Sequence, residues 1–136
     1  MLKLILADDE EMIRESIRAL IDWDSIGVEV VASCKNGPET LQAILTLHPD
    51  IVMTDIKMPG MSGLDLIAEV YNRKDLMTEF ILLSGYADFE YARQAITYRV
   101  SNYLLKPCNE NQIIEAVRKA SVEIRKRKKI KELIPD

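Results

Sequence analysis

The sequence predicts an α/β fold in which one sheet of five parallel strands is covered by helices on both faces. Five short apolar runs alternate with segments whose apolar residues recur at helical spacing, which is the pattern of β-α-β units. The 136 residues suit a single domain, because a chain of this size buries roughly two-thirds of its unfolded surface. A single packed core is therefore expected.

The five expected strands are the apolar runs themselves, and they occupy Lys3–Ala7, Val28–Ser33, Ile51–Thr54, Glu79–Leu83 and Asn102–Leu105. Crossovers between parallel strands are right-handed and both faces of the sheet need cover, which favours a doubly wound three-layer sandwich. We expect the flavodoxin-like strand order 2-1-3-4-5. This order places the first and third strands side by side at the switch point, where ligands collect.

Five helices are expected to connect and follow these strands. Two have clear apolar faces, formed by Ile13, Ile17, Leu20 and Ile21 in the first and by Ile113, Val117, Ala120 and Ile124 in the last. Helix starts are predicted at Asn36-Gly37-Pro38 and at Asp88, because Asn and Asp cap helices and Pro fits the first turn. The segment 22–27 is predicted to turn into the second strand.

The composition is that of an ordinary folded protein, with 48% hydrophobic and 29% charged residues. No apolar run is long enough to span a membrane. The first apolar run reaches Asp8 too soon for a signal peptide, so we expect a cytoplasmic protein. Cys34 and Cys108 form no metal or redox motif and are expected to be reduced.

The charge is unevenly distributed along the chain. Residues 1–117 contain 10 Lys and Arg against 19 Asp and Glu, whereas residues 118–136 contain 8 against 3. An acidic body repels the phosphates of nucleic acid. For the basic tail, a solvated linker helix is favoured over a nucleic-acid-binding patch.

Reactive polar residues follow four of the predicted strands: Asp8 and Asp9, Asp55, Ser84, and Lys106. The carboxyl ends of parallel strands lie at one edge of the sheet, so these side chains are expected to converge. Three converging carboxylates repel one another unless a cation offsets them, and carboxylate oxygens without His or Cys favour Mg²⁺. Asp55 is then placed as a nucleophile toward a phosphoryl group, with Lys106 and Ser84 available to meet its oxygens.

Around these residues the chain resembles the receiver domain of two-component response regulators. The matching motifs are Asp8-Asp9, Thr54-Asp55, Met58-Pro59-Gly60-Met61-Ser62-Gly63, Ser84-Gly85 and Tyr103-Leu104-Leu105-Lys106-Pro107. The resemblance implies a receiver domain over residues 1–120. Residues 121–136 would then be a basic helical extension or a linker to an effector outside these residues.

The resemblance also implies roles for individual residues. Asp55 would accept a phosphoryl group from a sensor histidine kinase, as a single-turnover phosphoacceptor rather than an enzyme, and Lys106 would pair with that group. The Mg²⁺ ligands would be Asp9, Asp55 and the backbone carbonyl of Lys57, with Asp8 acting through water. The Lys106-Pro107 peptide bond would be cis.

Ser84 and Tyr103 match the family's two switch residues. The surface expected to change with them comprises the fourth helix, the fifth strand and the fifth helix, and is a candidate homodimer face; its residues are Tyr91, Tyr98, Arg99, Tyr103 and Arg118. The stretch from Ile21 to Gly27 is similar to receivers that precede AraC-type helix-turn-helix domains. A covalently linked DNA-binding effector and a role in transcription regulation are therefore expected.

The same residues admit other interpretations. Taken alone, Asp8-Asp9 could cap a helix. An aspartyl phosphatase would need a DxD motif after the first strand, and a flavin-binding module would need a Ser/Thr/Gly phosphate loop there; Asp8-Asp9-Glu10 provides neither. No Gly-Lys-Ser/Thr motif for nucleotide binding occurs. A stand-alone phosphorelay carrier remains the alternative function.

Overall fold

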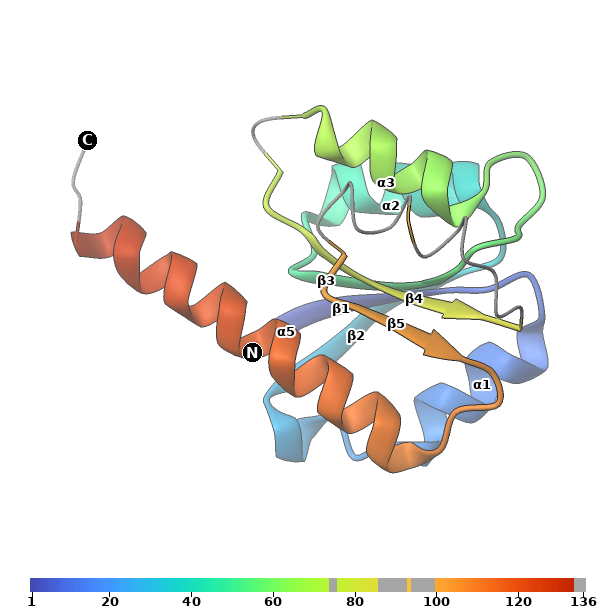
Figure 1. The fold of residues 1–136 in the computed structure, drawn as a ribbon, viewed down its shortest axis with the longest axis horizontal. Helices are drawn as coiled ribbons and strands as arrows, with labels where there is room; N and C mark the ends of the chain where they lie inside the picture. Colours follow the sequence, from blue (N-terminus) through green and yellow to red (C-terminus); the bar gives the residue numbers. More distant parts are fainter. Residues whose placement is uncertain (74–75, 86–92, 94–99, 134–136) are drawn as a thin grey trace.

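The computed structural model describes residues 1–73, 76–85, 93 and 100–133. Its centre is a parallel five-stranded sheet in the order β2-β1-β3-β4-β5 (Figure 1). This is the flavodoxin-like order predicted from the sequence. The strands are β1 Leu2–Ala7, β2 Val28–Cys34, β3 Ile51–Asp55, β4 Glu79–Ser84 and β5 Asn102–Leu105. Each boundary lies within one residue of its prediction.

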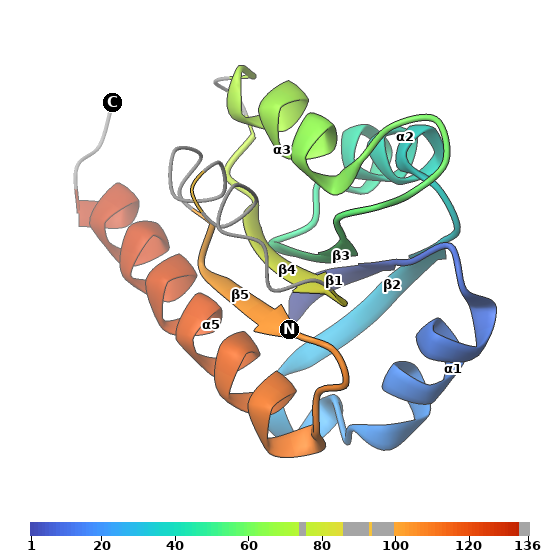
Figure 2. The same ribbon diagram turned by 45° about the vertical axis from the view of Figure 1, so that its right-hand side comes forward.

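Helices cover both faces of the sheet and complete three layers (Figure 2). The pair α2 (Gly37–Leu47) and α3 (Gly63–Tyr71) lies on one face, and α1 (Glu11–Leu20) and α5 (Glu110–Leu133) lie on the other. Alternate strand side chains enter two separate apolar clusters. Leu4 and Met53 join the α5 side, whereas Ile5 and Val52 join the α2 and α3 side.

Local signals explain where α2 and α3 begin. The side chain of Asn36 accepts a hydrogen bond from the backbone N–H of Glu39, and Pro38 occupies the first turn, as predicted. Ser62 and Asp65 form a reciprocal capping box at the start of α3. The α3 cap follows the Ser-x-x-Asp pattern, which the sequence analysis did not use.

The prediction for the first helix was wrong at its end. The helix stops at Leu20, whose side chain is 50% exposed, and Ile21 is buried from the extended segment that follows. Trp23, three residues later, is buried in the cluster beside α5, and its indole N–H donates to the carbonyl of Arg18. The short 3-10 helix η1 (Asp24–Ile26) then makes the predicted turn into β2.

The last helix is one continuous element. Its predicted apolar face is buried on the sheet, with Ile113, Val117, Ala120 and Ile124 all at most 4% exposed. Beyond this stripe the helix runs past the sheet to Leu133 (Figure 1). The basic tail therefore begins as a direct continuation of a packed helix.

At the amino edge of the sheet, where the strands begin, α5 is attached by ion pairs. The buried carboxylate of Glu79 pairs with Arg127 and accepts a hydrogen bond from the hydroxyl of Ser101. Lys128 pairs with Asp50 at 3.1 Å, and the other oxygen of Asp50 accepts from the backbone N–H of Lys3. This part of the tail is thus not a fully solvated helix.

The helix predicted to start at Asp88 lies outside the described residues, as do Tyr91, Tyr98 and Arg99. Among the helices that the structure describes, none is long and apolar enough to cross a membrane.

Candidate functional site

The parallel register brings the predicted site residues to one place, the carboxyl edge where the strands end. Ala7 pairs with Thr54, so Asp8 and Asp55 emerge from adjacent strands. Ser84 pairs with Leu105, so Lys106 emerges beside Ser84. The backbone N–H of Lys106 donates to the carbonyl of Ser84 at 2.7 Å, which holds the end of β5 against β4.

Lys106 joins the buried Asp8 and the partly buried Asp55. Its ammonium nitrogen Nζ lies 2.7 Å from Oδ2 of Asp8 and 3.2 Å from Oδ2 of Asp55. The side chains are 3%, 13% and 19% exposed for Asp8, Asp55 and Lys106, so water screens these contacts weakly. The Lys106-Pro107 peptide bond is cis, as the resemblance implied.

The environment changes the acidity of two of these groups. Burial raises the pKa of Asp55, and the negative charge of Asp8 adds to the effect, while Lys106 opposes it. Burial by itself disfavours the charged form of Lys106, but the hydrogen bond to Asp8 and the charges of Asp55 and Asp8 outweigh burial and raise the lysine pKa. Lys106 is therefore held as a cation, whereas Asp55 carries an incompletely compensated charge.

Asp8 does not serve as the N-cap of α1, which was the alternative for Asp8-Asp9. The N-cap residue is Glu10, and its backbone N–H donates to Oδ1 of Asp8 at 2.9 Å. The Asp8 side chain thus accepts from Glu10 on one oxygen and from Lys106 on the other. Its place in the structure is inside the site rather than on the helix end.

The carboxylates form a donor set that fits a hard divalent cation. Oxygens of Asp8, Asp9 and Glu10 lie within 4.8 Å of one another, and Lys106 connects Asp8 to Asp55. Asp8, Asp9, Glu10 and Asp55 bring four negative charges against the single charge of Lys106. The surplus of negative charge suits a divalent cation such as Mg²⁺, which prefers carboxylate and water oxygens. The proximity of Glu10 was not anticipated; its position directly after Asp8-Asp9 was the available signal.

The loop after β3 brings Lys57 to the same hollow as Asp9. Asp9, Lys57, Met58, Pro59 and Ser62 line one open hollow at this edge. Gly63 closes the loop: its N–H donates to the carbonyl of Ile56 at 2.6 Å, and a side chain at Gly63 would collide with the carbonyl of Asp55. A glycine is therefore required for the loop to pack against the strand that bears Asp55.

The two residues matched to the family switch lie at different depths. Ser84 is buried at 1% exposure at the end of β4, and Tyr103 is half-buried on β5, packed against the cluster that faces α2 and α3. Arg118 is exposed and pairs with Glu115 at 2.6 Å, one turn earlier on α5. The structure thus brings Ser84 to the carboxyl edge and leaves Tyr103 behind it on the neighbouring strand.

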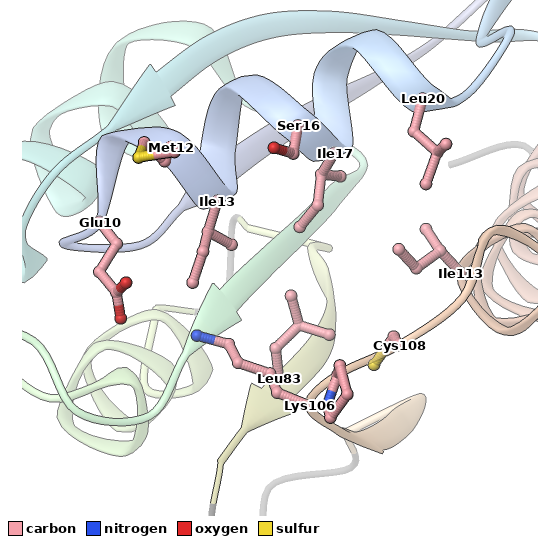
Figure 3. Close-up of a pocket in the computed structure, with 11 residues that line it drawn as sticks. Glu10, Met12, Ile13, Ser16, Ile17, Leu20, Leu83, Lys106, Cys108 and Ile113 are labelled. Atoms are coloured by element: carbon pink, nitrogen blue, oxygen red, sulfur yellow. The ribbon is translucent and has the colours of Figure 1, made fainter.

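An apolar groove of about 680 Å³ adjoins the site, between α1 and the segment leading into α5 (Figure 3). Its lining includes Ile13 and Ile17 from α1, Ile113 from α5, and Lys106. Met12 and Leu20, 82% and 50% exposed, also line it. The sequence analysis missed this surface because it assigned Leu20 to the packed face of the helix.

Comparison with known proteins agrees with the geometry. The family model described as "Response regulator receiver domain" matches residues 4–118. The chain is 44% identical over 126 residues to the transcriptional regulatory protein YesN of Bacillus subtilis, covering 93% of this chain and 34% of YesN. It is 37% identical over 113 residues to the transcriptional regulatory protein HptR of Staphylococcus aureus, covering 83% of this chain and 44% of HptR.

Solved structures give the same result. The receiver domain of AraT, a response regulator from Geobacillus stearothermophilus, aligns with a TM-score of 0.85 and 36% identity, covering 93% of this chain and 98% of that domain. A two-component transcriptional regulator AraC from Clostridium phytofermentans aligns with a TM-score of 0.85 and 26% identity, covering 94% and 98%. The chain spans about a third to less than half of the curated relatives described above. On its sequence and its fold, the chain belongs to the response regulator receiver domain family.

Proposed function

We propose that this receiver domain is a phosphoacceptor switch in which Asp55 receives a phosphoryl group from a sensor histidine kinase. The observation that carries the proposal is the cluster formed by Asp8, Asp55 and Lys106 at the carboxyl edge. In it, a half-buried carboxylate lies beside a fixed cation and next to further acidic groups. This arrangement suits transfer of a phosphoryl group to a carboxylate, because charge on the transferring oxygens must be met by cations.

The reaction forms one bond and breaks another. An oxygen of Asp55 attacks phosphorus as the bond from phosphorus to the donor's imidazole nitrogen breaks and its electron pair stays on that nitrogen. The donor's other ring nitrogen carries a proton, so the histidine leaves as neutral imidazole and an acyl phosphate remains on Asp55. Lys106 has three donor protons, and its contacts with Asp8 and Asp55 use two of them. The third can pair with a phosphoryl oxygen without loss of either carboxylate contact.

Mg²⁺, when bound, would offset the negative charge of the carboxylates and of the phosphoryl oxygens. Asp9, Asp55 and the backbone carbonyl of Lys57 would hold it directly, and Asp8 would act through water. The close contact of Asp8 with Lys106 supports this indirect role, because both Asp8 oxygens already accept hydrogen bonds. The raised pKa of Asp55 supports its role as nucleophile, since a more basic carboxylate attacks phosphorus more readily.

A kinase must bring its histidine to Asp55 along an accessible surface. The apolar groove beside Lys106, with Met12 and Leu20 exposed along it, suits packing of such a partner. We place this encounter in the cytoplasm.

The output would pass through Ser84 and Tyr103 to the face made by the fourth helix, β5 and α5, which would also serve for homodimer contact. Ser84 lies beside Lys106 where β4 and β5 end, and this position supports a contact between its hydroxyl and a phosphoryl group. A shift from mostly inactive to mostly active needs roughly 5 kcal/mol of differential binding, which charge-assisted contacts can supply.

Residues 1–120 would form the receiver, and residues 121–136 would connect it to a DNA-binding effector. The transcriptional regulators to which the chain is similar support this division. The single-turnover role on Asp55 distinguishes the domain from an enzyme. Transfer of phosphate onward to a histidine of another protein would instead favour the stand-alone phosphorelay carrier.

The decisive experiment is intact mass spectrometry after incubation with Mg²⁺ and acetyl phosphate. We expect one added phosphoryl group in the wild type and none in Asp55→Ala or in a metal-free sample. Asp22→Ala, which changes an exposed aspartate away from the site, is the matched control and should be phosphorylated like the wild type. An adduct that persists in Asp55→Ala, or that forms without metal, would overturn the proposal.

A further inference from the structure

Arg14, on the second turn of α1, makes two contacts that the function described so far does not use. Its Nη1 donates to the backbone carbonyl of Asp8 at 2.6 Å, and its Nε donates to the hydroxyl of Ser33 at 2.9 Å. The guanidinium is planar, so two fixed partners set its orientation. It ties α1 and β2 to the residue that follows β1.

The Asp8 carbonyl belongs to the peptide unit between Asp8 and Asp9. The N–H of Asp8 donates to the carbonyl of Cys34, and the Asp8 side chain is held by Glu10 and Lys106. The Arg14 contact fixes the remaining polar group of Asp8. The rotation of this peptide unit decides where the backbone of Asp9 begins, and Asp9 itself is exposed.

The guanidinium of Arg14 does not pair with a carboxylate in the part of the chain that the structure describes. The two groups that accept its hydrogen bonds, the Ser33 hydroxyl and the Asp8 carbonyl, are neutral. Arg14 lies beside the acidic cluster without pairing with one of its carboxylates. Its role is therefore better explained by the two groups to which it donates hydrogen bonds than by its charge. By its charge alone, it would weaken the binding of a cation nearby.

We propose that Arg14 is a positioning residue for the acidic pair: by holding the Asp8 carbonyl, it orients Asp9 for the divalent cation. The inference rests on the proposed function, because it takes the carboxyl edge to be a Mg²⁺ site. Groups that orient metal ligands from behind change metal affinity by about 10-fold or more when they are removed.

The sign of the effect separates positioning from charge. Arg14→Met removes a positive charge near a cation site, so electrostatics alone predicts tighter Mg²⁺ binding. Positioning predicts weaker binding, by about 10-fold. Arg14→Lys keeps the charge but cannot reproduce the two-point guanidinium contact, and it should also bind Mg²⁺ more weakly than the wild type.

The test is isothermal titration calorimetry of the whole chain with MgCl₂ at pH 7, which needs no phosphoryl donor. Arg18→Met is the matched control: Arg18 is exposed, lies one turn further along α1, and loses the same charge. It should bind Mg²⁺ as tightly as the wild type or slightly more tightly. Ser33→Ala removes only the acceptor of Nε, so its Mg²⁺ affinity should fall, but by less than that of Arg14→Met.

The named outcomes decide the inference. Unchanged or tighter binding in Arg14→Met, or an equal loss in Arg18→Met, would overturn it. If Arg14→Met does not fold, Ser33→Ala decides alone: weaker binding supports the inference and unchanged binding overturns it. Absence of Mg²⁺ binding in the wild type would remove the Mg²⁺ part of the proposed function, and this inference with it, whereas normal binding in both wild type and Arg14→Met would leave the proposed function intact.

Discussion

The amino edge of the sheet, where the strands begin, and the carboxyl edge, where they end, both carry clusters of acidic and basic residues. The two clusters differ in the ratio of carboxylates to cations. At the amino edge, Glu79 pairs with Arg127 and Asp50 pairs with Lys128, so each carboxylate has its own cation. At the carboxyl edge, Asp8 and Asp55 share Lys106, and Asp9 adds a further negative charge. A balanced cluster stabilises the fold. An unbalanced one leaves charge to be satisfied by a ligand, at some cost to the free protein.

The largest effect is expected when one carboxylate of the amino edge is neutralised, so that its cation is left unpaired. In Glu79→Gln we expect the free energy of unfolding to fall by about 2 kcal/mol, because the half-buried Arg127 loses its carboxylate partner. Urea denaturation followed by circular dichroism measures the change. Glu123→Gln removes an exposed carboxylate that pairs with Lys126 on the same helix and should change stability by less than about 0.5 kcal/mol. An equal loss in both variants would contradict a structural role specific to Glu79.

Adding the missing positive charge should stabilise the carboxyl edge. At a Mg²⁺ concentration ten times the dissociation constant, we expect a gain of about 1.4 kcal/mol in the wild type, measured as a rise in the thermal midpoint. Asp9→Asn should lose most of this gain, since a proposed ligand is gone. Glu79→Gln should keep all of it, because its change lies at the opposite edge. A gain of equal size in Asp9→Asn would show that Mg²⁺ acts elsewhere.

Removing a negative charge from the carboxyl edge should raise the stability of the protein, whereas removing one from the amino edge should lower it. Asp55→Asn is expected to raise the thermal midpoint at pH 7 by about 3 °C, or roughly 1 kcal/mol. The folded-state pKa of Asp55 is raised above its ordinary value of 3.8, so ionised Asp55 costs stability at neutral pH.

The same linkage fixes the pH dependence of that variant. As the pH falls through the folded-state pKa of Asp55, the wild-type carboxyl takes up a proton and the advantage of Asp55→Asn fades; below 3.8 it is gone. The exposed control Asp22→Asn should show no advantage at either pH. If Asp55→Asn gained more stability over the wild type at low pH than at pH 7, the cost could not come from burial of the ionised Asp55 carboxylate.

The smallest effect is expected at the exposed part of the amino edge. Lys128→Ala should lower the free energy of unfolding by about 0.5 kcal/mol or less, because the lysine side chain is 58% exposed. Adding 0.5 M NaCl should reduce even this difference, which the urea midpoint can follow. A loss as large as that of Glu79→Gln would mean that the pair of Lys128 with Asp50 holds the helix as strongly as the pair of Arg127 with Glu79.

The sheet and the convergence at its carboxyl edge could be predicted because local patterns determine both. Apolar runs fix the strands, and parallel pairing then forces Asp8, Asp55 and Lys106 together, whatever their distance in the sequence. The same reasoning does not predict which ion pairs long side chains form. The pairing of Arg127 with Glu79 produces no repeating pattern in the sequence, and a run of basic residues has the same composition whether it packs on the domain or is solvated.

Other features depended on choices that a pattern does not encode. Leu20 continues the apolar stripe of α1 in the sequence, yet the helix ends there and Leu20 is exposed, whereas Ile21 and Trp23 are buried. Arg14 is one of two arginines four residues apart on α1, and only the fold decides which of them reaches the Asp8 carbonyl. The metal-binding and phosphoacceptor roles of the site residues are chemical predictions that await the measurements above.

The continuity of α5 gives the molecule a lever. From Lys128, the last residue of α5 that pairs with Asp50 at the start of the sheet, to Leu133 the helix advances five residues, or about 7.5 Å. A tilt of about 10° about Lys128 would displace the tip by about 1.3 Å. A rigid rod anchored on the sheet can therefore turn an angular change too small to disturb the core into a displacement large enough to make or break a contact at its far end.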